Sequence, residues 1–239
     1  MQIALWGLRG GVGTTSVTAM LADVLSTAGD SVLLIDMNPD DMLRLHFGLP
    51  YGDERGWARA GLTPFWRQQT YQINEHLSIL PYGRHRSGDI CHYELAMTGD
   101  MFWAGYRNVL TAMYDWVLYD VPASTEHYSL LRQASDLNIM VAHVDMASHI
   151  LLEQSVLLPA TRILVNCLDP AHRLSNDILL VWRQQHGHYL LPGIVHLDQN
   201  VQEAFAHKAP VTTYKTASSG AHDMIGVARW CQALRREAA

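Results

Sequence analysis

Residues 9–16 read RGGVGTTS, and this glycine-rich stretch decides the fold expected for the chain. It follows an apolar run at residues 2–6 (QIALW), which is typical of a strand buried on both faces. It precedes apolar residues spaced as one stripe of a helix that should end at Gly29. A turn between such a strand and a helix N-terminus directs backbone N–H groups and the positive helix end toward one point. The stretch therefore predicts a phosphate-binding turn.

The same stretch departs from the usual P-loop pattern. Glycines at three of four consecutive positions let the backbone close around an anion without Cβ clashes, and Thr15 or Ser16 could offer a hydroxyl to magnesium. The P-loop pattern, however, has lysine directly after its last glycine, where this chain has Thr14, and Leu8 stands in place of the opening glycine. A tight turn that merely needs small residues is therefore the alternative interpretation.

Length and composition favour one folded α/β domain, residues 1–239. Hydrophobic residues make up 49% and charged residues 17% of the chain, no apolar run approaches the ~20 residues that span a bilayer, and the N-terminus is strand-like rather than a signal peptide. The formal net charge of −6 argues against nucleic acid as the main partner. Cys91, Cys167 and Cys231 are far apart, which favours reduced thiols over a disulfide framework.

Two later apolar runs end in aspartate. Residues 31–36 (SVLLID) end at Asp36 and lead through Asn38 into a turn, and residues 115–121 (DWVLYDV) place Asp120 near the strand end. Open α/β sheets bind ligands at the carboxyl ends of their strands, and an acid there typically binds magnesium through water. For Asp36, capping of a turn or helix is the alternative.

Strand and helix patterns alternate along the rest of the chain, which predicts a doubly wound, mostly parallel sheet with helices on both faces. The Trp- and Arg-rich segment at residues 49–73 could form a protein interface or pack a short helix onto the sheet. Residues 83–89 should form a loop, and Ser124 and Thr125 suit the N-cap of a helix that carries Leu130 and Leu131. Further strands are expected at 77–81, 137–144, 162–166 and 193–196, and helices at 42–46, 90–113, from about 148, from about 171, after Asp198 and at 221–236.

With these motifs in hand, the chain resembles the ParA/MinD group of deviant Walker A P-loop ATPases over nearly its whole length. Their KGGVGKT turn is matched by residues 9–15, and their Asp-x-Asp-Pro motif by residues 36–39. Their Walker B aspartate falls on Asp120 and their adenine-contacting asparagine on Asn166. Their Ile-Pro-x-Asp segment falls on Val195, His196, Leu197 and Asp198, and their later Gly-x-Pro-Val turn on residues 209–211.

The resemblance implies ATP and Mg²⁺ as cofactors, held in a sandwich between two subunits of a homodimer. It assigns magnesium to Thr15, Asp36 and Asp120, and roles in catalysis to Arg9, Asp36 and Asn38. In such a dimer Arg9 would reach the partner's phosphates. The nucleotide-binding set that it implies is Arg9, Gly10, Gly11, Val12, Gly13, Thr14, Thr15, Ser16, Asn166, Val195, His196, Leu197 and Asp198.

Three departures from the group weaken a simple ATPase interpretation. Arg9 stands where the group has a lysine that reaches the partner's phosphates, although an arginine could do this with a bidentate contact. Thr14 removes a charged contact to phosphate worth about 1.5–3 kcal/mol. Asn38 stands where the group has an aspartate associated with the attacking water, and an amide can orient that water but cannot take its proton. We therefore expect ATP to act mainly as dimer glue, with slow or no hydrolysis. A nucleotide-free scaffold is the alternative.

Within the group, residues 9–15, 43–45 (LRL) and 56–60 (GWARA) resemble the cellulose-biosynthesis branch. This implies a regulatory and assembly subunit of the bacterial cellulose synthase secretion system, cytoplasmic and peripheral to the inner membrane through the synthase. The implied partners are a small BcsR-like helper and a BcsE-like regulator that senses cyclic di-GMP, with no specific nucleic acid and no direct membrane insertion. A redox enzyme like the nitrogenase iron protein would need a cluster-binding cysteine just after the Asp120 strand, where this chain has none.

Overall fold

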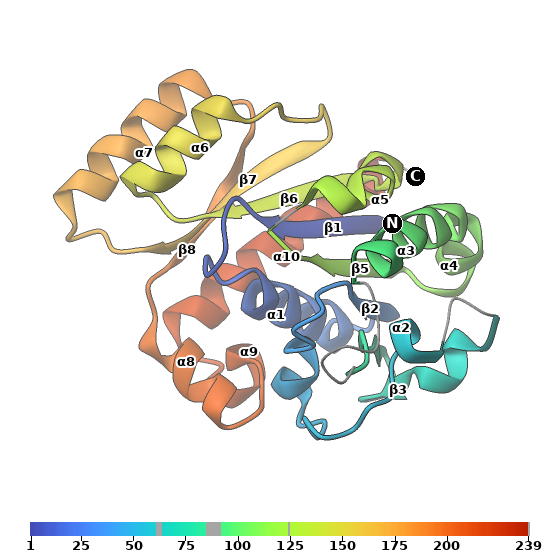
Figure 1. Cartoon of the computed structure of the whole chain (residues 1–239). Helices are drawn as coiled ribbons and strands as arrows, with labels where there is room; N and C mark the ends of the chain where they lie inside the picture. The colour runs from blue at the N-terminus through green and yellow to red at the C-terminus, as the bar shows by residue number, and fades with distance from the viewer. Residues whose placement is uncertain (61–63, 85–91, 124, 239) are drawn as a thin grey trace.

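A single eight-stranded sheet organises the computed structural model, which describes residues 1–60, 64–84, 92–123 and 125–238. The strand order is β3-β4-β2-β5-β1-β6-β7-β8, and every neighbouring pair is parallel except β3 with β4 (Figure 1). The strands are β1 (Gln2–Gly7), β2 (Val32–Asp36), β3 (Tyr71–Gln72), β4 (Leu77–Leu80), β5 (Trp116–Val121), β6 (Leu137–Ala142), β7 (Thr161–Leu168) and β8 (Leu190–His196).

Helices cover both faces of this sheet, as the alternating sequence pattern predicted (Figure 1). One face carries α1 (Thr14–Thr27), α8 (Gln199–Ala206), α9 (Val211–Tyr214), α10 (Ser219–Glu237) and the 3₁₀ turn η1 (Leu43–Phe47). The other carries α2 (Trp57–Ala60), η2 (Pro64–Gln69), α3 (His92–Gly105), α4 (Arg107–Met113), η3 (Thr125–Tyr128), α5 (Ser129–Ala134), α6 (Met146–Gln154) and α7 (Arg173–Gln185).

Strand alternation divides the core between these two layers. In β1, Ile3 and Leu5 belong to the apolar cluster under α1 and α10, whereas Ala4 and Trp6 belong to the cluster on the opposite face. Because β1 is buried on both faces, its sequence is a continuous apolar run rather than an alternating one. The central position of β1 places the loop that follows it at the middle of the sheet's carboxyl edge.

Two segments add detail to their sequence-based expectations. The helical region expected at roughly 90–113, with an irregular pattern around Gly99 and Gly105, is divided at Tyr106, which separates α3 from α4. In the Trp- and Arg-rich segment, Trp57 and Trp66 are buried, so in these two residues packing onto the sheet prevails over an exposed interface. Residues 85–89 of the expected loop, together with Cys91 and Ser124, lie outside the described residues.

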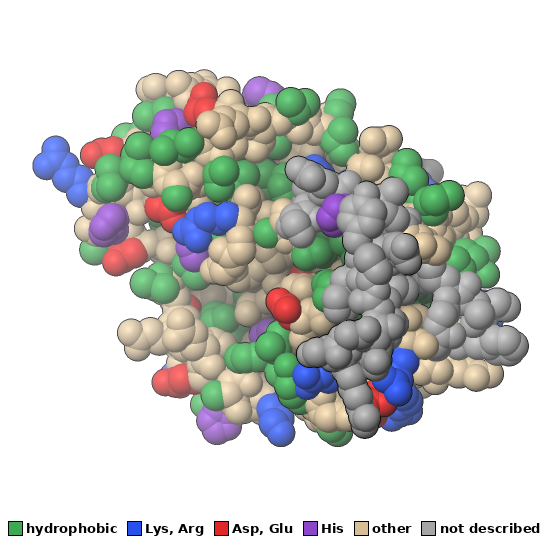
Figure 2. Space-filling model, viewed as in Figure 1, with side chains coloured by type: hydrophobic (Ala, Val, Ile, Leu, Met, Phe, Trp, Pro, Cys, Tyr) green, Lys and Arg blue, Asp and Glu red, His purple; other side chains and the backbone are tan. Residues whose placement is uncertain are grey.

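On the face seen in Figure 2, basic, acidic and apolar side chains are interspersed. Among the described residues, no helix is both long and apolar enough to cross a bilayer.

Candidate functional site

The loop from β1 to α1 depends on glycines at three points. Gly11 and Gly13 have φ values of 78° and 85°, in the left-handed region that glycine adopts without strain. At Gly7, the last residue of β1, an added Cβ would lie 2.7 Å from the carbonyl oxygen of Arg9 and 2.8 Å from Oγ1 of Thr14. The loop therefore folds back so close to the end of β1 that position 7 must be glycine, a requirement that the glycine-rich motif at residues 9–16 does not indicate.

Asn166 in β7 supports this loop through a side-chain hydrogen bond. Its Nδ2 donates a 2.8 Å hydrogen bond to the carbonyl oxygen of Val12, and the side chain is 5% exposed. The same Nδ2 lies 2.7 Å from where a Cβ of Gly13 would be. Asn166, which the resemblance predicts to contact adenine, therefore also supports the loop. The spacing of residues in the sequence does not indicate this contact with Val12.

Arg9 is bound within its own subunit. Its Nη2 lies 2.5 Å from Oδ2 of Asp145, and its Nε lies 3.4 Å from the hydroxyl of Ser148. Asp145 is fixed in turn because its Oδ1 accepts a hydrogen bond from the Ser148 amide and caps α6. To reach a second molecule, Arg9 would have to leave this carboxylate.

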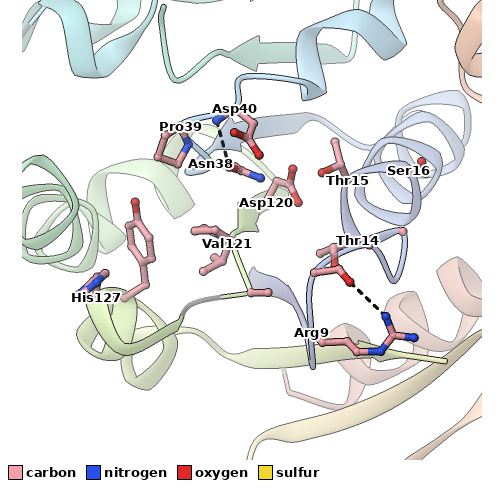
Figure 3. A pocket seen from close by; sticks show the side chains of 16 residues that line it. Arg9, Thr14, Thr15, Ser16, Asn38, Pro39, Asp40, Asp120, Val121 and His127 are labelled. Carbon is pink, nitrogen blue, oxygen red and sulfur yellow. Dashed lines mark hydrogen bonds between the residues drawn. The ribbon is translucent and has the colours of Figure 1, made fainter. Parts of the chain in front are cut away.

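A cavity of about 680 Å³ opens beside the loop (Figure 3). Its walls come from the glycine loop, from the turn after β2 and from the segment after β5, so three carboxyl strand ends contribute to it. The residues expected from the sequence that line it are Arg9, Gly10, Gly11, Gly13, Thr14, Thr15, Ser16, Asn38 and Asp120.

Asp36 and Asp120 meet at this edge of the sheet because they are register partners in neighbouring parallel strands. Both carboxylates are buried, at 0% and 2% exposure. Oδ1 of Asp120 lies 3.5 Å from the hydroxyl of Thr18, whereas its Oδ2 is buried without a hydrogen-bond partner in the described part of the chain. Burial raises the pKa of Asp120 to about 7, against the lowering effect of the hydroxyls of Thr15 and Thr18.

Asp36 lies behind the cavity and also organises the turn that follows it. Its two oxygens accept hydrogen bonds from the amides of Asn38 (2.8 Å) and Leu43 (3.3 Å). Burial raises the pKa of this carboxyl well above its ordinary value, and the charges of Asp120 and Asp41 raise it further. Asp36 thus organises the turn, as the alternative interpretation expected, in the same place where a carboxylate pair could face a cation.

The turn after β2 is anchored by two aromatic residues that the motifs did not indicate. The indole nitrogen of Trp57 donates to the carbonyl oxygen of Asp36 at 2.7 Å, and the hydroxyl of Tyr128 donates to that of Met37 at 2.8 Å. Trp57 lies in the GWARA run, so a tryptophan in an otherwise small-residue segment was the available signal. These contacts fix the backbone that presents Asn38 to the cavity.

Residues 195–198 do not line this cavity. Val195 belongs to the core under α1 and α10, and the amide of His196 donates to Asp223. Asp198 caps α8, as predicted, and its other oxygen accepts from the amide of Gly220. Leu197 is 54% exposed. This segment begins with the last two residues of β8, a strand that β6 and β7 separate from β1.

The cavity fits a triphosphate with magnesium. Gly11 has open space where a Cβ would lie, and the side chains of Thr15 and Asp120 point toward each other in the cavity (Figure 3). Among the described residues, no group of three or more His, Cys, Asp or Glu side chains could hold a metal alone. A magnesium ion here would therefore need oxygen ligands from phosphate and water, which is how Mg²⁺ is usually bound beside phosphates.

Comparison with known proteins places this site in context. The family model described as "Cellulose biosynthesis protein BcsQ" matches residues 1–232. A relative of that name from Salmonella typhi is 34% identical over 235 residues, which cover 96% of this chain and 93% of the relative.

Solved structures share the fold at lower identity. The MinD protein of Pyrococcus horikoshii OT3, solved with Mg-ADP, has 19% identity and a TM-score of 0.75, covering 98% of this chain and 97% of its own. A ParA family ATPase from Chlorobium tepidum TLS has 17% identity and a TM-score of 0.73, covering 95% of this chain and 98% of its own. The architecture expected from the sequence is thereby confirmed.

Proposed function

The chain belongs to the BcsQ family of cellulose biosynthesis proteins, and from this premise we propose that it binds ATP with Mg²⁺ as a regulatory and assembly subunit of a bacterial cellulose synthase complex. The observation that carries this proposal is the cavity at the glycine loop, where left-handed glycines stand opposite a buried Asp120 oxygen that has no hydrogen-bond partner in the described part of the chain.

In this proposal the backbone amides of residues 10–16 bind the phosphates at the N-terminus of α1. Thr15 and Asp120 hold the magnesium ion, and Asp36 acts through water from behind. Magnesium would supply positive charge that neutralises the phosphates and the buried carboxylate pair. MinD of Pyrococcus horikoshii with Mg-ADP and a cobyrinic acid a,c-diamide synthase of Mycobacterium smegmatis with an ATP analogue and magnesium support this assignment by their shared fold.

In this proposal ATP acts mainly by holding two subunits together. Arg9 is bonded to Asp145 in the single chain, and a partner's phosphate could replace that carboxylate with a stronger, bidentate anion. Asn38 lines the cavity, but its Oδ1 already accepts from the Asp40 amide, and an amide cannot take a proton from water. Since phosphoryl transfer depends on positioning and charge more than on a strong base, turnover is slow rather than necessarily absent.

The resemblance supplies the wider setting of the proposal. The subunit would be cytoplasmic and lie at the inner membrane through the synthase, with a BcsR-like helper and a BcsE-like regulator as partners. The net charge of −6 fits the expectation that it takes no specific nucleic acid.

A nucleotide-free scaffold is the second candidate, favoured by Thr14, which removes the lysine of the P-loop pattern, and by the ion pair that already satisfies Arg9. The two candidate functions predict different results for the Thr15→Ala variant. If ATP joins the subunits, this variant loses both nucleotide and dimer, whereas in a scaffold it keeps its assembly state and still supports cellulose output.

Light scattering with and without Mg-ATP tests the proposal. We expect the mass of the wild type to double with nucleotide, and Arg9→Ala to remain a monomer. Arg173→Ala is the matched control, because that side chain is 95% exposed and its ion pair spans 3.9 Å, and it should dimerise like the wild type. A wild-type mass that is the same with and without Mg-ATP would contradict the proposal. An Arg9→Ala variant that still forms a dimer with Mg-ATP would rule out the cross-subunit role of Arg9.

A further inference from the structure

A second cavity, of about 340 Å³, lies next to the nucleotide cavity and shares Ala123 as a wall with it. It is formed where the end of β1 meets α5 and the C-terminal end of α6. Trp6, Leu8, Arg132, Leu151 and Val156 line it. Nothing in the proposed nucleotide chemistry uses these five side chains.

Arg132 differs from the arginines that carry structural ion pairs. Arg9, Arg107 and Arg235 each pair with an aspartate. The Arg132 guanidinium lies 4.1 Å from the Trp6 ring centroid, but among the described residues it has no carboxylate partner and donates no hydrogen bond.

Burial lowers the pKa of Arg132, and its Nε is buried with no acceptor among the described residues. An arginine stays charged under all physiological conditions, so this half-buried positive charge rests against the Trp6 ring but meets no described carboxylate. Buried polar groups in folded proteins are normally satisfied, and an exception calls for a missing partner. The partner that matches a guanidinium best is a carboxylate or another planar oxyanion.

The rim of the same cavity is apolar and exposed. Val156 is 92% and Leu151 37% exposed, and the adjoining row on α6 presents Met146 at 48% and Ile150 at 51%. Contiguous exposed apolar surface around a polar anchor is typical of a protein-binding site rather than a site for a small ion.

We propose that this cavity binds a segment of a partner protein in which a carboxylate side chain stands beside an apolar one. The carboxylate pairs with Arg132, and the apolar side chain packs on Leu8, Leu151 and Val156. The binding requires no nucleotide, so it stands or falls separately from the function proposed above.

An array of ten-residue peptides tests this inference on the full chain. Each peptide carries a central Asp or Glu flanked by Leu, Ile, Phe or Val, and each is matched by a peptide with Asn or Gln in the central position. We expect acidic peptides to bind and their amide counterparts to bind more weakly. For the best peptide, Arg132→Gln should weaken affinity about 10- to 100-fold, as expected for a charged hydrogen-bonded pair. Arg229→Gln, an equal charge change on the exposed side of α10, should leave affinity as in the wild type.

Thermal unfolding separates binding from folding. Because Arg132 has no ion pair with any residue that the structure describes, Arg132→Met should keep the wild-type Tm or exceed it while losing the peptide. The proposal is overturned if no acidic peptide binds better than its amide counterpart, or if Arg132→Gln binds as tightly as the wild type. Inorganic phosphate that binds alone and displaces the peptide at equal concentration would also overturn it, in favour of a small-anion site.

Discussion

At the scale of single residues, Thr14 sets the chemistry of the site. It begins α1, and its Oγ1 lies so close to the end of β1 that a Cβ at Gly7 would approach it to 2.8 Å. A threonine here keeps the turn compact but brings no positive charge to the phosphates. Affinity must then come from backbone amides and the helix N-terminus, whose strength depends on the shape of the loop.

Gly13→Ala tests that dependence on shape. The φ of 85° strains any other residue, and the new Cβ would meet Asn166 Nδ2 at 2.7 Å, so we expect the loop to shift and Mg-ATP affinity to fall by at least about tenfold. Isothermal titration measures it. Gly226→Ala is the control, because it lies within α10 with open space around it and should gain about 0.5–1 kcal/mol of stability. Equal affinity in Gly13→Ala and the wild type would show that the loop shape is not required.

Asp120 makes stability depend on pH. In the folded protein its carboxyl keeps a proton up to pH about 7, whereas the unfolded chain releases it near its ordinary pKa of 3.8. Between these values the native state binds more protons, so the free energy of unfolding of the nucleotide-free protein falls as pH rises. Asp36, with its pKa also raised, acts in the same direction.

We therefore expect Asp120→Asn to be more stable than the wild type at pH 8, by up to about 4 kcal/mol, and to differ little at pH 4. Urea denaturation at pH 4, 6 and 8 without magnesium measures this. The same variant should lose Mg-ATP binding, because the Asp120 carboxylate that destabilises the nucleotide-free protein at high pH is also the group that binds the magnesium ion. A wild type and variant with parallel pH profiles would refute the titration of Asp120 in this range.

At the scale of elements, the segment from β2 to η1 connects the nucleotide cavity to the loop before α2. Arg44 in η1 is fully buried, pairs with Asp41 at 2.9 Å and donates to the carbonyl oxygens of Asp53 and Arg55. It thereby fixes the loop before α2, whose Trp57 in turn holds the carbonyl of Asp36. One arginine thus supports the backbone on which the site is built.

Arg44→Ala should destabilise the protein by about 3–5 kcal/mol, because it leaves the buried Asp41 and several carbonyl groups unpaired. The midpoint of urea unfolding measures this loss. Arg173→Ala, at an exposed position, should change stability by less than about 0.5 kcal/mol. A small effect of Arg44→Ala would mean that the loop before α2 is held by its other contacts.

Elements with strong local patterns were predictable, and those formed by tertiary contact were not. The central strands β1, β2, β5 and β6 appear in the sequence as apolar runs because they are buried on both faces of the sheet. Strand β3 and helix α9 span two and four residues and have no pattern of their own. The loop residues and Asp120 were found from motif spacing, whereas the contact from Asn166 to Val12 joins residues 154 positions apart. No local signal could reveal it.

At the scale of the whole molecule, the parallel sheet brings distant residues to one edge. The glycine loop, the β2 turn and the β5 end are separated along the chain but follow strands that are hydrogen-bonded neighbours in the order β2-β5-β1. The second cavity lies beside this edge, so a partner bound there would share a wall with the nucleotide cavity. The fold thus places two candidate binding sites next to each other without any residue common to their chemistry.

Isothermal titration of Mg-ATP into the wild-type protein and Thr14→Lys tests most directly whether this loop binds a triphosphate without its lysine. We predict saturable binding to the wild type and binding about 10- to 100-fold tighter in Thr14→Lys, which regains a charged contact to phosphate. Absence of binding heat in both proteins, at concentrations up to millimolar nucleotide, would contradict the account.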